Sequence, residues 1–174
     1  MARYFSSLGQ FALYLATQAK KGYENEIGKA LDQIGAAIKH QVEQDIGQYQ
    51  PGIDQYPAWA PLKPSTLETK ARYNWGKGGN PDTPLYATGA FASDIGFSTN
   101  KKQLAVTIGS NKDYILYTEF GTRNMAPRPV FGPAALKVLP KFVPLIGKYA
   151  AAGISGITVN AGPVKSYGST MFTD

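Results

Sequence analysis

The first fifty residues place apolar side chains at steps of three and four, the spacing of one face of an α-helix. Polar residues of both charge signs fill the other positions, and the pattern ends at Gln50 because a residue before proline avoids helical dihedral angles. The sequence therefore predicts a long amphipathic helix or a helix pair divided at Gly22, whose striped face needs a sheet or another subunit to lie against. The apolar positions are Leu8, Phe11, Leu15, Ile27, Leu31, Ile34, Ile38, Val42 and Ile46.

Shorter elements are predicted after residue 84. Alternating residues over 95–99 and 104–108, separated by a turn near Asn100, are typical of a β-hairpin with one apolar face. The stretch 88–94 has room for one or two helical turns. Helical spacing over 113–120 predicts another short helix, followed by Gly121 as a residue that can take positive φ. A last helix is expected over 134–149, with Pro133 in its first turn and a kink or break near Pro140 and Pro144.

Length and composition indicate one α+β domain. The 174 residues are 43% hydrophobic, which is enough to bury one core. We expect this domain over residues 1–149, made of helical residues 1–50, a loop-rich arm over 51–84, and the hairpin and helices over 85–149. In the arm, Ser65 and Glu68 have the spacing of a capping box. Residues 150–174 are rich in Gly and Ser, with a strand-like piece at 157–159, and are expected to be a C-terminal extension that orders on a partner or not at all.

Several kinds of chemistry are excluded by composition. The chain has no Cys and one His, His40, so it has no thiolate nucleophile, disulfide, thiolate metal site or site with two imidazoles. The apolar run 11–19 is too short and too mixed to span a bilayer, and no cleavage site follows a basic start, which favours a protein made in a cytoplasm without a membrane partner. The loop over 76–82, GKGGNPD, lacks the phosphate-loop spacing. We expect no enzyme, cofactor or metal.

Paired carboxylates leave a small hydrolase open in principle. The candidate acids lie beside predicted turns, where an active site could gather them, but helix capping explains Glu68 and Asp113 as well. These acids are Glu68, Asp94, Asp113 and Glu119.

Positive charge is concentrated after the first helix. The net charge is +6, and the basic excess falls wholly in residues 51–174. Basic residues interleave with aromatic residues in the arm, a combination that can neutralise phosphates and stack on bases. A basic nucleic-acid-binding protein is therefore an alternative function, and the tryptophans could equally anchor the arm on the core. The candidate basic contact patch is Lys63, Lys70, Arg72 and Lys77, with Trp59, Tyr73 and Trp75 nearby.

An ordered series of short motifs runs from about residue 59 to 149. It consists of Trp59-x-Pro61-Leu62 with Thr66 and Lys70, Pro84-Leu85 with Thr88-Gly89, Tyr114 and Tyr117 before Glu119-Phe120-Gly121-Thr122, and Arg128-Pro129-Val130-Phe131 with Pro133-Ala134. In order and spacing this series resembles the tail-completion, or head–tail joining, proteins of long-tailed bacteriophages. These are also known as neck, minor tail or virion morphogenesis proteins.

The resemblance implies a structural virion protein without catalysis. Such a protein is expected at the top of the tail, as a ring commonly of six subunits, between the tail terminator or tail tube protein and the head connector or stopper proteins. Its basic excess would face these protein partners or the genomic DNA in the channel. A tail terminator or a connector stopper is the alternative within virions. The GKGGNPD loop and the C-terminal extension depart from the family pattern.

The motifs also supply candidate interface or loop-shaping residues. Pro127 and Pro129 restrict Arg128 on both sides, which suits a bidentate contact with a carboxylate, either Glu119 or one on a neighbouring subunit. Gly121 permits the turn, and Thr122 can bond to the local backbone. The full set is Trp59, Glu119, Phe120, Gly121, Thr122, Arg128, Pro129 and Phe131.

Overall fold

The long predicted helix forms without interruption. In the computed structural model, which describes residues 7–160, α1 (Leu8–Asp45) is one helix of 38 residues. The hydroxyl of Ser7 accepts a hydrogen bond from the Gln10 amide and caps its start. At its end, Gly47 adopts φ +93°, which turns the chain away. The alternative of a helix pair divided at Gly22 is therefore wrong.

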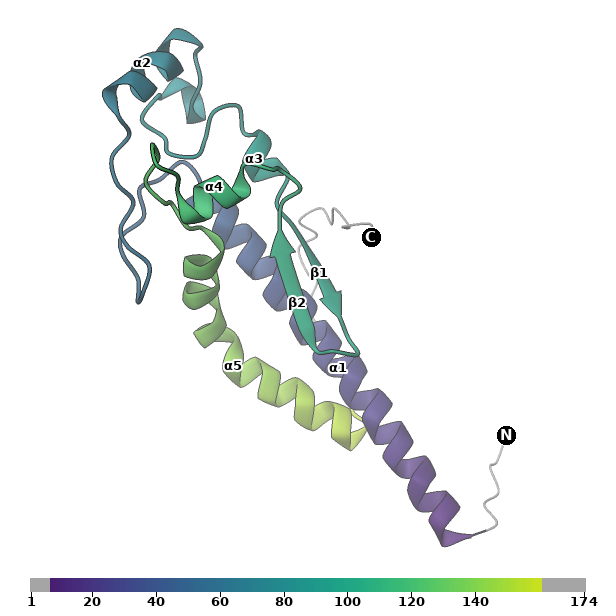
Figure 1. Cartoon of the computed structure of the whole chain (residues 1–174). Coiled ribbons are helices and arrows are strands. Elements are labelled where there is room, and N and C mark those ends of the chain that lie inside the picture. The colour runs from purple at the N-terminus through teal and green to yellow at the C-terminus, as the bar shows by residue number, and fades with distance from the viewer. Residues whose placement is uncertain (1–6, 161–174) are drawn as a thin grey trace.

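Gly22 instead allows two helices to approach closely. The last helix, α5 (Phe131–Ser155), lies against α1 (Figure 1). A Cβ added at Gly22 would lie 2.5 Å from the Gly153 carbonyl oxygen, and one added at Gly153 would lie 2.6 Å from Tyr23 Cα. Because neither glycine has a side chain, the two backbones meet directly at this point.

The helix α5 bends but does not break at its prolines. Pro140 and Pro144 both lie inside the helix and are exposed, so their missing N–H groups fall on the outer side. The helix changes direction along its length (Figure 1). Pro133 lies in the first turn, as predicted.

The C-terminal end of α5 differs from the prediction. The helix continues six residues past Tyr149 and ends at Gly156, whose φ is +70°. Residues 157–159 form no strand, and the backbone N–H of Val159 donates to Glu26 Oε2 of α1 at 3.0 Å. The first part of the expected extension therefore packs on the same chain. Residues 161–174, the rest of that extension, lie outside the described residues.

The predicted hairpin is present. Strands β1 (Gly96–Asn100) and β2 (Ala105–Gly109) pair antiparallel, with Phe97 opposite Ile108 and Thr99 opposite Val106. Both strands contact α1, so the hairpin packs against the long helix. Together with the helices, this small sheet gives the predicted α+β fold, which is mostly helical.

Short elements gather near the C-terminal end of α1 (Figure 1). They are α2 (Pro64–Arg72), the 3-10 turn η1 (Lys77–Gly79), α3 (Ala90–Ser93) and α4 (Ile115–Phe120). The capping box at Ser65 and Glu68 is wrong: Pro64 already occupies the first helical position, so Ser65 lies inside the helix and Lys63 precedes it without a side-chain cap. Asp113 is not a cap either, because Tyr114 occupies that position of α4.

The core lies between α1, α5 and the segments that surround the end of α1. A second, smaller cluster joins α1 to the later turns of α5 through Ile27, Ala30 and Tyr149. The main cluster takes buried side chains from α1, from the arm and from α5, so these elements share one core. This packed part of the chain is called the body below. The main cluster contains Ile34, Ile38, Val42, Ile46, Trp59, Phe91, Ile95, Val130, Ala134 and Val138.

Candidate functional surfaces and an apolar pocket

Trp59 anchors the arm on the start of α5. The side chain is buried, and its indole Nε1 donates to the Pro129 carbonyl oxygen at 3.1 Å. Pro129 is itself buried, and Phe131, the first residue of α5, packs on the main core. Three of the candidate interface residues therefore hold the chain to itself. Of the two interpretations of Trp59, the anchoring one is confirmed.

Arg128 and Glu119 do not pair with each other. Arg128 donates from Nη2 to the carbonyl oxygens of Ala60 at 2.9 Å and Pro61 at 3.3 Å. Glu119 instead accepts the backbone N–H groups of Val130 at 2.8 Å and Phe131 at 3.3 Å through Oε1. The expected internal pair is wrong because the guanidinium turns toward the arm while the carboxylate takes up N–H groups at the beginning of α5.

Glu119 lies at the start of α5, where it can accept N–H groups, and its burial there raises its pKa. A carboxylate at a helix N-terminus satisfies N–H groups that have no partner within the helix. Burial raises the pKa of Glu119 above its ordinary value, and the hydrogen bonds from Val130 and Phe131 partly oppose that rise. The Glu119 carboxylate therefore has a structural role, which is to accept backbone N–H groups at the start of α5.

The Gly121–Thr122 motif forms a tight turn. Gly121 has φ +75°, and a Cβ there would lie 2.8 Å from the Met125 carbonyl oxygen. Thr122 and Met125 exchange two backbone hydrogen bonds, and Thr122 Oγ1 accepts from the Asn124 amide at 3.3 Å. The turn at Gly121 and the local hydrogen bond of Thr122 are therefore present as predicted. Phe120 beside it is 79% exposed, so this member of the candidate interface set faces solvent.

The candidate basic contact patch is divided by burial. Lys70 is buried, and its Nζ donates to the carbonyl and hydroxyl oxygens of Thr83. Its inclusion in a surface patch is therefore wrong. Lys63 is exposed and donates to the Asn124 carbonyl oxygen at 2.8 Å, while Arg72 and Lys77 are exposed. Burial of Lys70 interrupts the predicted row of phosphate-neutralising charges.

Two of the four acidic candidates, Asp94 and Glu119, have hydrogen-bond partners that hold segments of the chain together. Asp94 Oδ2 accepts the Ser110 hydroxyl at 2.6 Å and the Asn111 amide at 2.8 Å, which ties α3 to the end of β2. These hydrogen bonds, Ser110 first, lower the pKa of Asp94. On α1, the Nε2 atoms of His40 and Gln44 lie 2.8 Å apart and share a hydrogen bond. Over residues 7–160, no group of three His, Asp or Glu side chains is placed to hold a metal ion.

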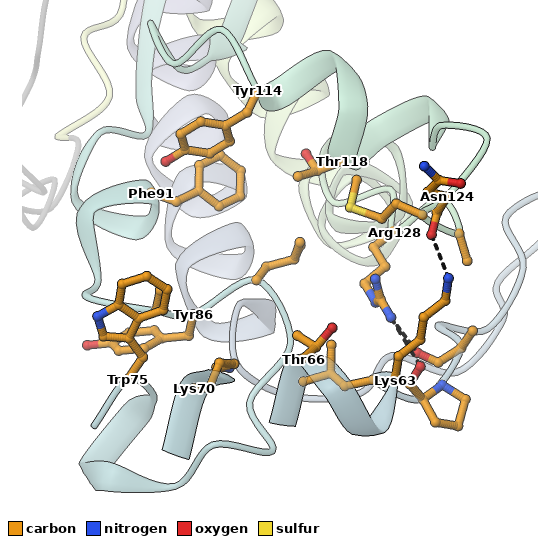
Figure 2. Close-up of a pocket in the computed structure, with 17 residues that line it drawn as sticks. Lys63, Thr66, Lys70, Trp75, Tyr86, Phe91, Tyr114, Thr118, Asn124 and Arg128 are labelled. Carbon is orange, nitrogen blue, oxygen red and sulfur yellow. Dashed lines mark hydrogen bonds between the residues drawn. The ribbon is translucent and has the colours of Figure 1, made fainter. Parts of the chain in front are cut away.

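A pocket that the sequence did not predict lies between α2, α4 and the loops around them. Its volume is about 540 Å³, and most of its lining is apolar. Aromatic side chains, Trp75, Tyr86, Phe91 and Tyr114, lie on one side, and Lys63 and Arg128 lie on the other (Figure 2). Trp75 and Lys70 stood out in the sequence as basic and aromatic residues, but their spacing gave no sign of an enclosed site.

The N-terminal part of α1 forms a second distinctive surface. Residues 8–21, here called the projecting segment, extend beyond the body (Figure 1), and none of them is buried. Leu8 is 82% exposed, Leu13 is 70% exposed and Leu15 is 49% exposed. Leu8, Phe11 and Leu15 share one face of the helix by their spacing. The apolar stripe that predicted a long helix is thus buried along one part of α1 and exposed along another.

Comparisons with known proteins identify no relative of this chain. No family model, no curated protein sequence and no solved structure matches the chain. Among the described residues, no helix combines the length and the apolar character needed to cross a membrane. The pocket and the projecting segment are therefore interpreted from their own geometry.

Proposed function

We propose that the protein is a structural component of a tailed bacteriophage virion that completes the tail and joins it to the head connector as an oligomeric ring. The motif series over residues 59–149 supports the proposal through its resemblance to head–tail joining proteins. The observation that carries it is the projecting segment, which presents Leu8, Leu13 and Leu15 to solvent from a part of α1 in which no residue is buried.

The projecting segment suits assembly between copies. Its fourteen residues extend about 20 Å along the helix axis, at about 1.5 Å per residue. Burial of exposed leucine stabilises an interface by about 25 cal/mol for each Å² of apolar surface removed from water. In a closed ring every subunit offers the same surfaces, so one segment that packs on the next body repeats around the ring. Repetition then gives avidity toward a ring-shaped neighbour.

The body suits the task of holding such a segment rigidly. The direct backbone contact at Gly22 and Gly153 marks the point where the projecting segment leaves the body. Farther along α1, the Lys137 ammonium joins α5 to Asp45 at 2.8 Å and to Gln50 at 2.7 Å. A helix fixed at these points transmits position from the ring to the projecting end. The expected neighbours are the tail terminator or tail tube protein on one side and connector or stopper proteins on the other.

The assembly part of this proposal is tested by the mass of the full chain in solution. We expect wild type to form a ring, with six subunits favoured, and the double variant Leu8→Asp, Leu15→Asp to be monomeric in sedimentation velocity. Gln10→Asp with Thr17→Asp is the matched control, because it adds the same charges at the same seven-residue spacing on the side of the helix opposite Leu8, Phe11 and Leu15. Loss of the ring in both variants, or in neither, contradicts the assigned face.

The virion part is tested by electron microscopy of phage particles that carry the tagged chain. Label confined to the neck supports the joining role, and the side of the neck on which it lies separates a tail-completion protein from a terminator or a stopper. Particles assembled with the Leu8→Asp, Leu15→Asp chain are expected to accumulate as filled heads and separate tails. Absence of label from the particles rejects the structural role and turns attention to salt-dependent nucleic-acid binding.

A further inference from the structure

The pocket has two chemically different ends. Phe91 and Tyr114 meet edge to face with ring centroids 5.8 Å apart, and together with Trp75 they form an aromatic end. Arg128 and Lys63 form the other end (Figure 2). None of the described residues that line the pocket carries a carboxylate, so nothing in the lining neutralises these cations. An occupant that complements both ends must join an apolar ring to an anion.

Arg128 provides an unused donor at the cationic end. The residue is only 7% exposed, and its Nη2 is engaged by the Ala60 and Pro61 carbonyl oxygens. Its Nε is buried and has no hydrogen-bond partner among the described residues. A buried N–H without an acceptor is unfavourable, and a carboxylate is the acceptor that matches the planar donor arrangement of a guanidinium. Arg128 therefore holds a donor without a partner at the cationic end, and because Nε itself is buried, an incoming acceptor reaches it only after the guanidinium shifts.

The size and surroundings of the pocket favour a segment of protein. A volume of 540 Å³ holds an aromatic side chain together with its neighbours in the chain. Outside the pocket, α4 exposes Leu116, Tyr117 and Phe120 at 60%, 57% and 79%. This helix contributes Thr118 to the lining and its N-cap residue contributes Tyr114, so one element carries both the pocket wall and an apolar surface beyond it. A partner larger than a single small molecule can use both.

We propose that the pocket binds an acidic–aromatic segment of a partner protein, with an aromatic side chain at the Phe91 end and the adjacent Asp or Glu carboxylate on Arg128 and Lys63. The inference stands on the pocket itself and not on the proposed role in a virion. Burial lowers the pKa of both Arg128 and Lys70, and an anion beside them would offset that effect. Arg72 and Lys77, which a nucleic acid would also need, are not part of the lining.

The side chain of Arg128 provides a direct signal for the test. Arginine Nε–H groups give their own cross-peaks in ¹⁵N–¹H NMR spectra, and the exposed Arg72 and Arg123 serve as internal controls. The probe is a short acetylated peptide amide with Phe followed by Asp between Gly and Ser residues. We expect the Arg128 Nε–H and the Trp75 indole N–H to shift in a saturable way. Replacement of the peptide Asp by Asn, or of its Phe by Ala, should weaken binding about tenfold.

Two variants separate occupancy of the pocket from general stability. Thr66→Trp places a large ring at an exposed lining position of α2, and Ser65→Trp places the same ring one residue away, outside the lining. Thr66→Trp should abolish the peptide shifts, and Ser65→Trp should keep them. Arg128→Lys, checked for an intact fold by thermal unfolding, should weaken binding about tenfold because the fork of donors is lost.

Three results overturn the proposal. The first is no shift at Arg128 with the Phe–Asp peptide up to about 5 mM, a concentration that detects even weak binding. The second is equal binding of the Asp and Asn peptides, which would make the cations irrelevant. The third is a saturable Arg128 shift with a short oligothymidylate and none with the peptide, which would assign the pocket to nucleic acid.

Discussion

The two parts of α1 have similar patterns and opposite surroundings. Residues 22–45 bury their apolar face against α5, the hairpin and the arm, while residues 8–21 bury none of their side chains. The distinction cannot come from helix propensity or amphipathicity, since both parts form one helix. It depends on what lies beside each part. An apolar stripe thus predicts that a helix will pack, and the rest of the fold decides whether it packs within the chain or outside it.

The largest expected effect belongs to the buried part. Ile46, the C-cap residue that directly follows this part, is 0% exposed, and Ile46→Ala should reduce the free energy of unfolding by about 2–5 kcal/mol through lost burial and a residual cavity. Urea denaturation monitored by the fluorescence of the buried Trp59 measures this change. A loss below about 1 kcal/mol would mean that the core at the end of α1 is loosely packed and would remove the contrast between the two parts.

The boundary between the two parts should tolerate no side chain at Gly153. A Cβ there meets backbone atoms of Gly22 and Tyr23, so Gly153→Ala must move the helices apart and should cost about 1–3 kcal/mol. Gly147→Ala is the matched control on α5, because nothing lies within 4 Å of its added Cβ, and it should stabilise by up to about 1 kcal/mol. Thermal unfolding of the pair provides the measurement. Equal effects would place the closest approach of α1 and α5 elsewhere.

A pH-dependent effect is expected inside the body, at the start of α5. Because the pKa of Glu119 is raised in the folded protein, its contribution to stability is complete below its ordinary value of 4.5. That contribution is lost as pH rises through the raised folded value. Urea denaturation from about pH 4.5 to 7 should show this decline, and Glu119→Gln should remove it from the profile. An unchanged profile in the variant would assign the decline to other groups.

The smallest expected effect belongs to the projecting segment. Leu13 is 70% exposed, so Leu13→Ala should change the unfolding free energy of the monomer by less than about 0.5 kcal/mol. Denaturation at a dilution where the chain is monomeric, compared with Ile46→Ala under the same conditions, tests the contrast directly. A cost near that of Ile46→Ala would show that the segment packs on its own body in solution.

The predicted elements with repeated local signals are found in the structure. Apolar spacing predicted the helix α1, alternation predicted the hairpin, and Gly121 lies at the positive φ expected of it. The predictions were wrong where one local pattern is compatible with more than one structure. Pro64 displaced Ser65 as the start of α2, and the Gly- and Ser-containing stretch after Tyr149 continued as helix because α1 lies beside it.

The site residues were predicted less well than the elements. Arg128 and Glu119 were expected to attract each other, but each found closer backbone partners, carbonyl oxygens for Arg128 and N–H groups for Glu119. Lys70 was read as a surface charge, but its long side chain reaches Thr83 in the interior. Such choices depend on distances between segments far apart in the chain, and no local pattern contains them.

By itself, the sequence determined the long helix, the hairpin, the turn at Gly121 and the absence of cysteine chemistry, because dihedral preferences, side-chain periodicity and composition act locally. The tertiary structure alone decided which part of α1 is covered, why Gly22 and Gly153 are glycines, and that aromatic residues and Arg128 enclose one pocket. These features depend on which surfaces meet when distant segments pack. Packing is a property of the whole chain, since the environment of each side chain is supplied by residues elsewhere in it.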